Sequence, residues 1–460
     1  MPLPTPDTAL VLEAAEAVVV EVRQAEFTRL RIARDWALAN PPDPAQLARN
    51  PLCARALGVS GLLVTQCVEG ELGACLEIHA LTALRLMADA VDIETRLPAV
   101  WNALADLRLE VWVARKIAAA TSRLSRSLAL WVDGQIAELL GSMPAGRLLK
   151  VVEARVVEAD QELADQIAAQ RAELRGFWLG RDEGDGNRSA FARGSAVDLR
   201  RFEAMVTHLA GLLREHGSDL EAESTDELRA RAFALLGNPL AALKLLVGAQ
   251  SQSGEPDVPE VIAEAIRTAP PTKTRPRTTC YVHLTPDTLR GRGVARAEEL
   301  GSWTRLQLID FLAHEHVTLK PVIDLNTEIA ADAYEVPADV GEQTRLARPV
   351  DCFPYATSIS RRQDRDHTDP YRPHGPPGQT RLSNLGHLVR RHHLIKTHAG
   401  WRVWQHRDRF FWITPHGRIY ITDSRGTHRL DLEVGTLDDA VRVALDYTRT
   451  PTSVAPPMTG

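Results

Sequence analysis

The sequence is poor in cysteine, and its cysteines are not spaced for either of their common structural roles. Five cysteines occur in 460 residues, at positions 53, 67, 75, 280 and 352, and none forms a Cys-x-x-Cys pair. An odd number without such pairs argues against a disulfide framework and against a four-cysteine zinc site. This usage is typical of a protein in a reducing compartment.

Long apolar runs are also missing. The most apolar stretch near the start, residues 9–22, is interrupted by Glu13, Glu16 and Glu21 and has no basic segment before it. A signal peptide needs a basic segment ahead of an apolar one, and a membrane-spanning helix needs about 20 predominantly apolar residues. The sequence therefore predicts neither, and we expect a cytoplasmic protein that has no membrane partner.

The chain as a whole has no excess of positive charge, because 54 Lys and Arg against 60 Asp and Glu give a formal net charge of −6. Residues 351–425 depart from this pattern, with 13 Lys and Arg against 6 Asp and Glu. The same segment, extended to residue 428, contains nine of the 15 histidines. A basic segment on an acidic body is the pattern expected where phosphates bind, and histidine is the usual acid, base or metal ligand near neutral pH.

Length and composition predict a globular protein of two or three domains. Hydrophobic residues make up 44% of the chain and charged residues 25%, which is ordinary for a soluble protein. Residues 9–250 have apolar side chains at helical spacing, so we predict a mainly α-helical domain of unknown function there. A short β-hairpin over residues 177–191, turning at Asp185-Gly186, interrupts it. Residues 251–277 read as a linker.

The second half of the chain predicts smaller units. Residues 278–350 indicate a mixed α/β module, with strands at 279–284 and 317–325 flanking a helix near 303–313, and a further helix at 337–345. Residues 351–430 form the last unit, and residues 431–460 are a C-terminal tail. Within the last unit, the alternation of apolar and polar residues over 401–420 predicts a hairpin whose tryptophans are core.

One constellation in this last unit has the residue types for cutting a phosphodiester. Asp366-His367 is followed by a Pro/Gly-rich loop at residues 371–379, then by Asn384, then by a helix-forming stretch that contains His393. The order predicts strand, loop, second strand and helix. Cutting needs a base that activates water and a divalent cation that neutralises charge on the phosphate. Residues 364–398 contain candidates for both.

The order and spacing of these residues resemble an HNH nuclease motif. The residues that carry the resemblance are Asp366-His367, the Gly-Pro-Pro-Gly-Gln-Thr loop at 375–380, Asn384-Leu385, Arg390-Arg391-His392-His393 and Lys396-Thr397. His393 follows Asn384 by nine residues, which is similar to the separation in that superfamily. The resemblance implies a C-terminal ββα-metal (HNH) domain, and hence an α+β chain.

The resemblance also implies a role for each residue. His367 would be the general base on water, Asp366 and His393 would hold the catalytic metal, and Asn384 would fix the loop that orients the base. Mg²⁺ or Mn²⁺ is the first expectation, while histidine and carboxylate ligands also tolerate Zn²⁺ or Ni²⁺. DNA is the expected partner. We expect the side chains of Asp366, His367 and His393 to point to one place.

The resemblance extends upstream of the motif. Three segments, Gly293-Val294-Ala295-Arg296, Pro321-Val322-Ile323-Asp324-Leu325 and Tyr334-Glu335-Val336-Pro337, are similar to the join in an actinobacterial family. Its members place a helical domain of unknown function before an HNH endonuclease, as in the mycobacterial "thirteen-E-twelve" repeat type. Many members carry cysteines that look like a structural zinc knuckle. Here Cys352 has no such partner, and Val389 occupies the position at which those members have a cysteine in the helix. No structural zinc is therefore expected.

Several interpretations stay open. Basic residues near the motif can bind DNA phosphates, or they can form a solvated basic face; they are Arg361, Arg362, Arg365, Arg390, Arg391, His392 and Lys396. The first hypothesis for the chain is a metal-dependent HNH endonuclease that hydrolyses DNA phosphodiester bonds. The second is a catalytically silent DNA-binding or regulatory protein that retains the HNH fold, and the third is assembly through the helical half. The DNA specificity and oligomeric state stay open.

Overall fold

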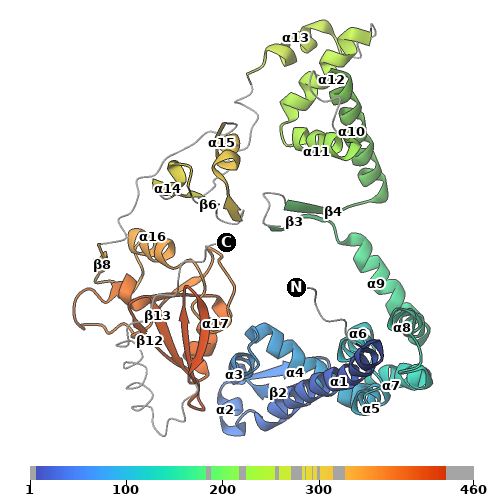
Figure 1. Ribbon diagram of the computed structural model, residues 1–460, viewed down its shortest axis with the longest axis vertical. Helices are drawn as coiled ribbons and strands as arrows, with labels where there is room; N and C mark the ends of the chain where they lie inside the picture. Colours follow the sequence, from blue (N-terminus) through green and yellow to red (C-terminus); the bar gives the residue numbers. More distant parts are fainter. Residues whose placement is uncertain are drawn as a thin grey trace. The chain divides into compact units, whose positions relative to one another are not determined.

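The computed structural model describes residues 7–182, 188–216, 224–253, 258–270, 282–284, 286–292, 294–297, 301–313 and 327–430 (Figure 1). Helices and small antiparallel sheets make up the chain, which is α+β as predicted. Contacts divide it into two compact units, Met1–Ala164 with Lys320–Gly460, and Asp165–Leu319. This grouping differs from the predicted linear order of domains, because the beginning and the end of the chain share one unit.

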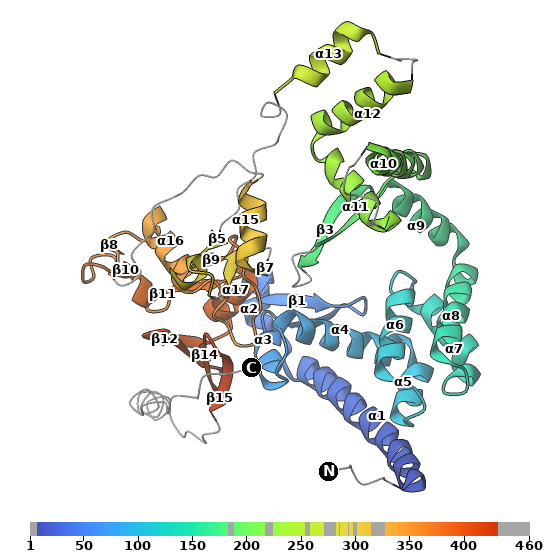
Figure 2. The same ribbon diagram turned by 45° about the horizontal axis from the view of Figure 1, so that its top comes forward.

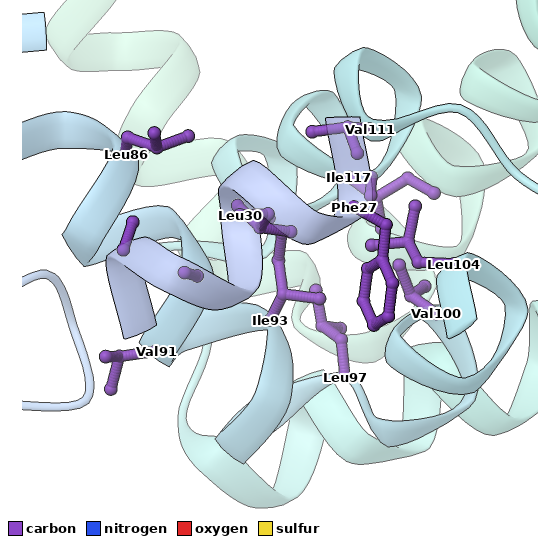
Figure 3. Close-up of a cluster of buried hydrophobic side chains, with 14 of the residues drawn as sticks. Phe27, Leu30, Leu86, Val91, Ile93, Leu97, Val100, Leu104, Val111 and Ile117 are labelled. Carbon is purple, nitrogen blue, oxygen red and sulfur yellow. The ribbon is translucent and has the colours of Figure 1, made fainter. Parts of the chain in front are cut away.

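The helical part of the first unit is built around α1 (Thr8–Ala39), which contacts α4, α5 and α6. The other helices are α2 (Pro44–Arg49), α3 (Glu69–Cys75), α4 (Ala80–Arg96), α5 (Pro98–Ala105), α6 (Val111–Thr121), α7 (Arg126–Ile136) and α8 (Ala145–Ala159). Figure 3 shows the core that they enclose, with Phe27 and Leu30 of α1 among Ile93, Leu97 and Val100. An unpredicted hairpin of β1 (Ala54–Leu57) and β2 (Leu62–Thr65) precedes α3.

Capping residues explain where several of these helices begin. The Asp7 carboxylate accepts a hydrogen bond from Ala9 N at the start of α1, and Ser125 does the same for Leu128 N at the start of α7. Such side chains satisfy amides that have no partner inside the helix. Asp133 is buried and accepts from Ala99 N at 2.7 Å, at the start of α5. Burial raises the pKa of Asp133.

The second unit contains the predicted β-hairpin, confirmed as β3 (Gly176–Asp182) paired with β4 (Arg188–Arg193). α9 (Gln161–Glu173) spans the division between the units. The remaining elements are α10 (Ala196–His216), α11 (Thr225–Leu236), α12 (Pro239–Ser253), α13 (Glu260–Thr268), β5 (Val282–His283), α14 (Pro286–Leu289), β6 (Ala295–Ala297), β7 (Gly301–Trp303) and α15 (Arg305–Ala313). The helix expected near residues 303–313 is thus present. The strand predicted at 317–325 lies outside the described residues.

No single helix in the described ranges combines the length and the apolar character that a bilayer crossing requires. Two helices, α11 and α12, reach the required length and apolar character only when taken together, and they are bent by 117° at the break between them.

The C-terminal part of the first unit carries the predicted order of strand, loop, strand and helix. Its elements are β8 (Ala330–Ala331), α16 (Ala338–Ala347), β9 (Asp364–His367), β10 (Thr380–Arg381), β11 (Leu385–Leu388), α17 (Arg390–His398), β12 (Arg402–His406), β13 (Arg409–Ile413), β14 (Ile419–Asp423) and β15 (Gly426–Leu430). β9 and β11 are antiparallel, with His367 opposite Leu385. β12 to β15 form a four-stranded meander, drawn in red-orange in Figure 2. Trp401 and Trp412 are buried, which confirms their prediction as core.

Helix α3 packs directly on this C-terminal part, more than 300 residues away along the chain. Glu69 forms an ion pair with Arg391 of α17, and a Cβ added to Gly70 would lie 2.8 Å from Ile395 Cγ2. The Glu71 carboxylate accepts from His416 Nδ1 at 2.7 Å. Cys67, Ala74 and Ala80 share one apolar cluster with Leu388, Trp401 and Trp412. The start of the chain therefore completes the core on which α17 lies.

Because this contact contains a buried ion pair, we expect Glu69→Ala to destabilise the first unit. The Glu69 side chain is 1% exposed and that of Arg391 is 20% exposed, so the substitution leaves a largely buried guanidinium group without its carboxylate partner. Removing one partner of a buried pair costs about 3–5 kcal/mol, and the partial exposure of Arg391 reduces this to about 2–3 kcal/mol. Urea unfolding followed by tryptophan fluorescence measures the change. Glu13→Ala, at an exposed position of α1, is the control, and equal stability of the two variants would contradict the expectation.

His387 is a second buried polar side chain, which the sequence did not single out. It lies on β11, is 4% exposed, and neither ring nitrogen has a hydrogen-bond partner among the described residues. Burial, and then the charges of Arg345 and Arg365, lower the pKa of His387 to about 4. The folded protein therefore holds this ring neutral at pH values where an unfolded chain protonates it.

His387 should make stability fall with acidification. The unfolded state binds a proton below its pKa of 6.5 and the folded state does so only near 4, so stability is lost as the pH falls through this window. At about 1.4 kcal/mol per pKa unit, the loss is about 3 kcal/mol. His387→Leu removes the titration, and urea unfolding near neutrality and near pH 4 should show a correspondingly smaller loss. A variant with the wild-type pH dependence would refute this assignment.

Candidate active site

The candidate site lies where β9 faces α17. Side chains two residues apart on a strand share a face, and side chains three apart on a helix share a face. Asp364 and Asp366 of β9 therefore point to the same side as each other, and they meet His393 and Lys396 of α17. The sequence produces this arrangement because α17 follows β11 directly and β11 pairs with β9.

Asp366 and His393 converge, as the sequence predicted. His393 Nε2 lies 3.6 Å from Asp366 Oδ1, and His393 Nδ1 lies 2.8 Å from Asp364 Oδ2. A carboxylate only accepts hydrogen bonds, so Nδ1 donates to Asp364 and the lone pair of the neutral ring is on Nε2. That atom faces Asp366. Burial alone would raise the pKa of Asp364, but hydrogen bonds from His393 and Arg390 hold this pKa below its usual value.

The chemistry of this pair fits a divalent cation. Ligand bonds of about 2.1 Å at angles between a right angle and a tetrahedral one separate two donor atoms by about 3.0–3.5 Å, close to the 3.6 Å between Asp366 Oδ1 and His393 Nε2. The Asp364 hydrogen bond is the kind of outer contact that orients a metal-binding histidine. Among the described residues, no group of three or more His, Cys, Asp or Glu is placed to hold an ion. A cation here would depend on water or substrate oxygens for its other ligands, as Mg²⁺ commonly does.

Lys396 fixes the second carboxylate oxygen of Asp366. Its Nζ lies 2.8 Å from Asp366 Oδ2 and donates to the backbone oxygen of His367 at 2.7 Å. The other oxygen of Asp366, Oδ1, is the one that faces His393. Lys396 was predicted to bind phosphate, and in the structure its ammonium group is instead held between two residues of β9.

The side chain of His367 lies on the opposite side of β9 from that of Asp366, toward the loop that joins β9 to β11. Its Nε2 lies 2.8 Å from Thr380 Oγ1, and its ring stacks on Tyr334 with centroids 5.9 Å apart. The Thr380 hydroxyl donates its one proton to Ala333 O, so it accepts from His367 Nε2. The lone pair of the neutral ring is then on Nδ1. Burial lowers the pKa of His367, which favours the neutral ring near pH 7.

The three side chains expected to point to one place are thus only partly brought together. Asp366 and His393 meet, whereas the contacts of the His367 ring are with Thr380, Tyr334 and Tyr371. The alternation of side chains along β9 accounts for this, because Asp366 and His367 are adjacent. The charge of Asp366 still acts on His367, whose pKa it raises against the effect of burial. A base and a cation that act on opposite sides of one phosphate do not need to touch.

Asn384 closes the loop between β9 and β11. Its Oδ1 accepts from Thr368 Oγ1 at 2.9 Å and from Asp369 N at 2.7 Å. Its Nδ2 donates to Asp369 O at 3.1 Å and to Gln379 O at 3.0 Å. Oδ1 thus accepts two hydrogen bonds and Nδ2 donates two, all of them with residues at the two ends of the loop. The residue that follows His367 is therefore held in place.

Most of the basic residues predicted to bind phosphate are already paired. Arg361 forms two contacts with Glu342, at 2.9 and 3.1 Å, and Arg391 is paired with Glu69. Arg390 is 71% exposed and lies 3.3 Å from Asp364. Arg362 and Arg365 are exposed, and their guanidinium groups form no ion pair in the part of the chain that the structure describes. Only these two retain the free charge that the sequence suggested for the set.

His392 requires a correction. It was grouped with the phosphate-binding residues, but its side chain is 0% exposed and its Nδ1 lies 2.7 Å from Asp351 Oδ2. The ring stacks on Phe353, with centroids 4.4 Å apart. A ring with no exposed surface cannot reach a DNA backbone, so the predicted contact is wrong. Asp351 also accepts from Val389 N at 2.9 Å, so the pair anchors the first turn of α17.

Two residues with a defined place in the site, Asp364 and Thr380, were missed as functional candidates. Asp364 has a signal in the sequence, because it lies two positions before Asp366 and a strand would put both on one face. Thr380 belongs to the loop of the resemblance, but nothing in the pattern gave it a partner. Its hydrogen bond to His367 depends on the position of Ala333, which lies 47 residues earlier.

Comparison with known proteins gives one partial likeness. An uncharacterized protein of Mycobacterium tuberculosis is 41% identical to this chain over 97 residues, which are 20% of this chain and 18% of that protein. No family model matches the chain, and no solved structure matches it. The match covers less than a fifth of the relative, so the family named from the sequence stays a prediction.

The contact between Thr380 and His367 predicts which ring nitrogen carries the proton. In wild-type protein near neutral pH, we expect long-range ¹H–¹⁵N spectra to show His367 protonated on Nε2. Thr380→Val removes the acceptor and should shift the ring toward a mixture of tautomers by about fivefold, which corresponds to about 1 kcal/mol for one hydrogen bond. Thr380→Ser keeps the hydroxyl and should restore the wild-type spectrum. A wild-type ring protonated on Nδ1 would refute the assignment.

Proposed function

We propose that residues 351–430 form an HNH-type domain and that the protein is a metal-dependent endonuclease that hydrolyses DNA phosphodiester bonds in the cytoplasm. The observation that carries the proposal is the series Asp364–His393–Asp366. A carboxylate orients an imidazole, whose free nitrogen meets a second carboxylate at 3.6 Å. A carboxylate that orients a histidine whose second nitrogen faces a further donor is the arrangement found around metal-binding histidines.

Each residue of the site has a defined task in this proposal. Asp366 and His393 hold the cation, Asp364 orients His393, and Lys396 fixes Asp366. A bound Mg²⁺ or Mn²⁺ supplies charge neutralisation at the scissile phosphate, and Zn²⁺ or Ni²⁺ is compatible with the same ligands. The assignment follows the chemistry of the donor atoms.

His367 takes the proton from the attacking water. Its neutral ring has a lone pair on Nδ1, because Nε2–H donates to Thr380. The proton of the water moves to Nδ1 while the water oxygen forms the new bond to phosphorus and the bond to the leaving oxygen breaks. The lowered pKa of His367 supports this role near neutral pH. Asn384 holds the residues after His367 and thereby limits the motion of the ring.

A second candidate function is a catalytically silent DNA-binding protein. It is favoured by one observation, which is that the His367 ring makes its contacts with Thr380, Tyr334 and Tyr371 and not with Asp366 or His393. A plasmid assay of the purified protein distinguishes the two functions, because a catalytically silent protein would bind DNA without cutting it.

The endonuclease predicts cation-dependent nicking of supercoiled plasmid. We expect nicked circles with Mg²⁺ or Mn²⁺ and none with chelator. His367→Ala should lower the initial rate at least about 100-fold, as expected for loss of a general base. His393→Ala should lower it comparably and should also weaken Mn²⁺ binding measured by calorimetry without DNA.

The matched control is His398→Ala, an exposed histidine in the last turn of the same helix. It should keep the wild-type rate, which separates loss of a site residue from loss of any histidine on α17. Retarded plasmid without nicking, whichever ion is added, would rule out the endonuclease in favour of the silent binder. Nicking that survives in both His367→Ala and His393→Ala would place the activity outside this site.

A further inference from the structure

A cavity of about 400 Å³ lies beside the candidate site, between the Asn384-closed loop and β12. Among its lining residues are Thr368, Asp369, Arg372, Arg381, Trp404 and Gln405. Thr368 and Asp369 directly follow the candidate base His367 in the chain. An occupant of the cavity would therefore contact the backbone segment that directly follows the candidate base, although the His367 ring itself does not line the cavity.

Hydrogen bonds form this cavity in advance of any ligand. The Gln379 amide accepts from Arg372 N at 2.9 Å and donates to Arg372 O at 3.0 Å, which closes the loop on itself. Gln405 Nε2 donates to Leu382 O at 3.1 Å and ties β12 to the loop. A preformed cavity of this volume lies within the range of small-ligand sites. It accommodates a single nucleotide and is too small for a duplex.

The charge of the cavity differs from that of its surroundings. The side chains of Arg372 and Arg381 are exposed and have no ion-pair or hydrogen-bond partner within the described ranges. Arg361 and Arg391, by contrast, are neutralised by Glu342 and Glu69. Asp369 also lines the cavity, so the two arginines and this carboxylate leave a formal charge of +1 (+2 − 1). That charge favours an anion, and phosphate is the anion that guanidinium binds with two parallel hydrogen bonds.

The remaining lining suits a nucleobase. Trp404 stacks on Phe411 with centroids 5.2 Å apart, and Pro370, Pro376 and Pro377 add flat apolar surface. Two buried atoms of lining residues, Trp404 Nε1 and Gln405 Oε1, lack a hydrogen-bond partner in the described structure.

We propose that this cavity binds one unpaired nucleotide of the DNA strand, next to the phosphate to be cut. Arg372 and Arg381 hold its phosphate, and the surface of Trp404 and the prolines contacts its base. The substrate class is then DNA with at least one unpaired nucleotide, either single-stranded or with a base displaced from the duplex. This inference rests on the proposed function, and it adds the substrate to it.

The test is fluorescence anisotropy in chelator, where no cutting occurs. Three labelled DNAs of one sequence are compared: a perfect duplex, the same duplex with one unpaired nucleotide, and the single strand. Wild-type protein should bind the DNAs with an unpaired nucleotide at least about tenfold more tightly than the perfect duplex, within the range that stacking of one base supplies. The double variant Arg372→Ala/Arg381→Ala should reduce this ratio to near one.

Arg402→Ala is the matched control, because Arg402 is an exposed arginine of β12 that does not line the cavity. It should weaken binding to all three DNAs equally and leave the ratio unchanged. An equal affinity of wild-type protein for all three DNAs, or a ratio that survives in the double variant, overturns the inference. If wild-type protein nicks plasmid but shows no such ratio, only the cavity assignment fails. Protein that neither binds nor nicks any DNA refutes the proposed function as well.

Discussion

Two pairs of side chains, matched in spacing, hold the candidate site together. Strand β9 presents carboxylates two residues apart, and helix α17 presents an imidazole and an ammonium group three residues apart. Each spacing puts its pair on one face of its element, so both pairs meet when the strand and the helix pack. The orientations of the His393 ring and of the Asp366 carboxylate depend on this contact.

Helix α17 can hold that position because its other face is also fixed. His392 bonds to buried Asp351, Arg391 pairs with Glu69, and Ile395 packs against Gly70 of α3. Glu69 and Gly70 belong to the start of the chain. The helical part therefore supports the candidate site physically, whatever further role it has. A reading of the chain as independent domains in series would not have predicted this.

The elements that the sequence predicted correctly are those that local patterns determine. The hairpin of β3 and β4, the helix after Asn384 and the buried tryptophans of β13 and its neighbours follow from alternation, turn residues and helical spacing. The meeting of Asp366 with His393 came from a resemblance in order and spacing. The burial of His392, the partner of Arg391 and the bond of Thr380 to His367 depend on residues far away in the chain. No local pattern contains that information.

The charge of residues 351–425 shows why a count along the sequence overstates a binding surface. A formal charge belongs to a residue, but attraction for phosphate depends on what faces that residue in the fold. Arg361, Arg391 and Lys396 each have a carboxylate partner, which cancels most of their field. Arg372 and Arg381 have none in the described structure and lie at a cavity. Free positive charge therefore lies near the loop that Asn384 closes, as well as at Arg362 and Arg365.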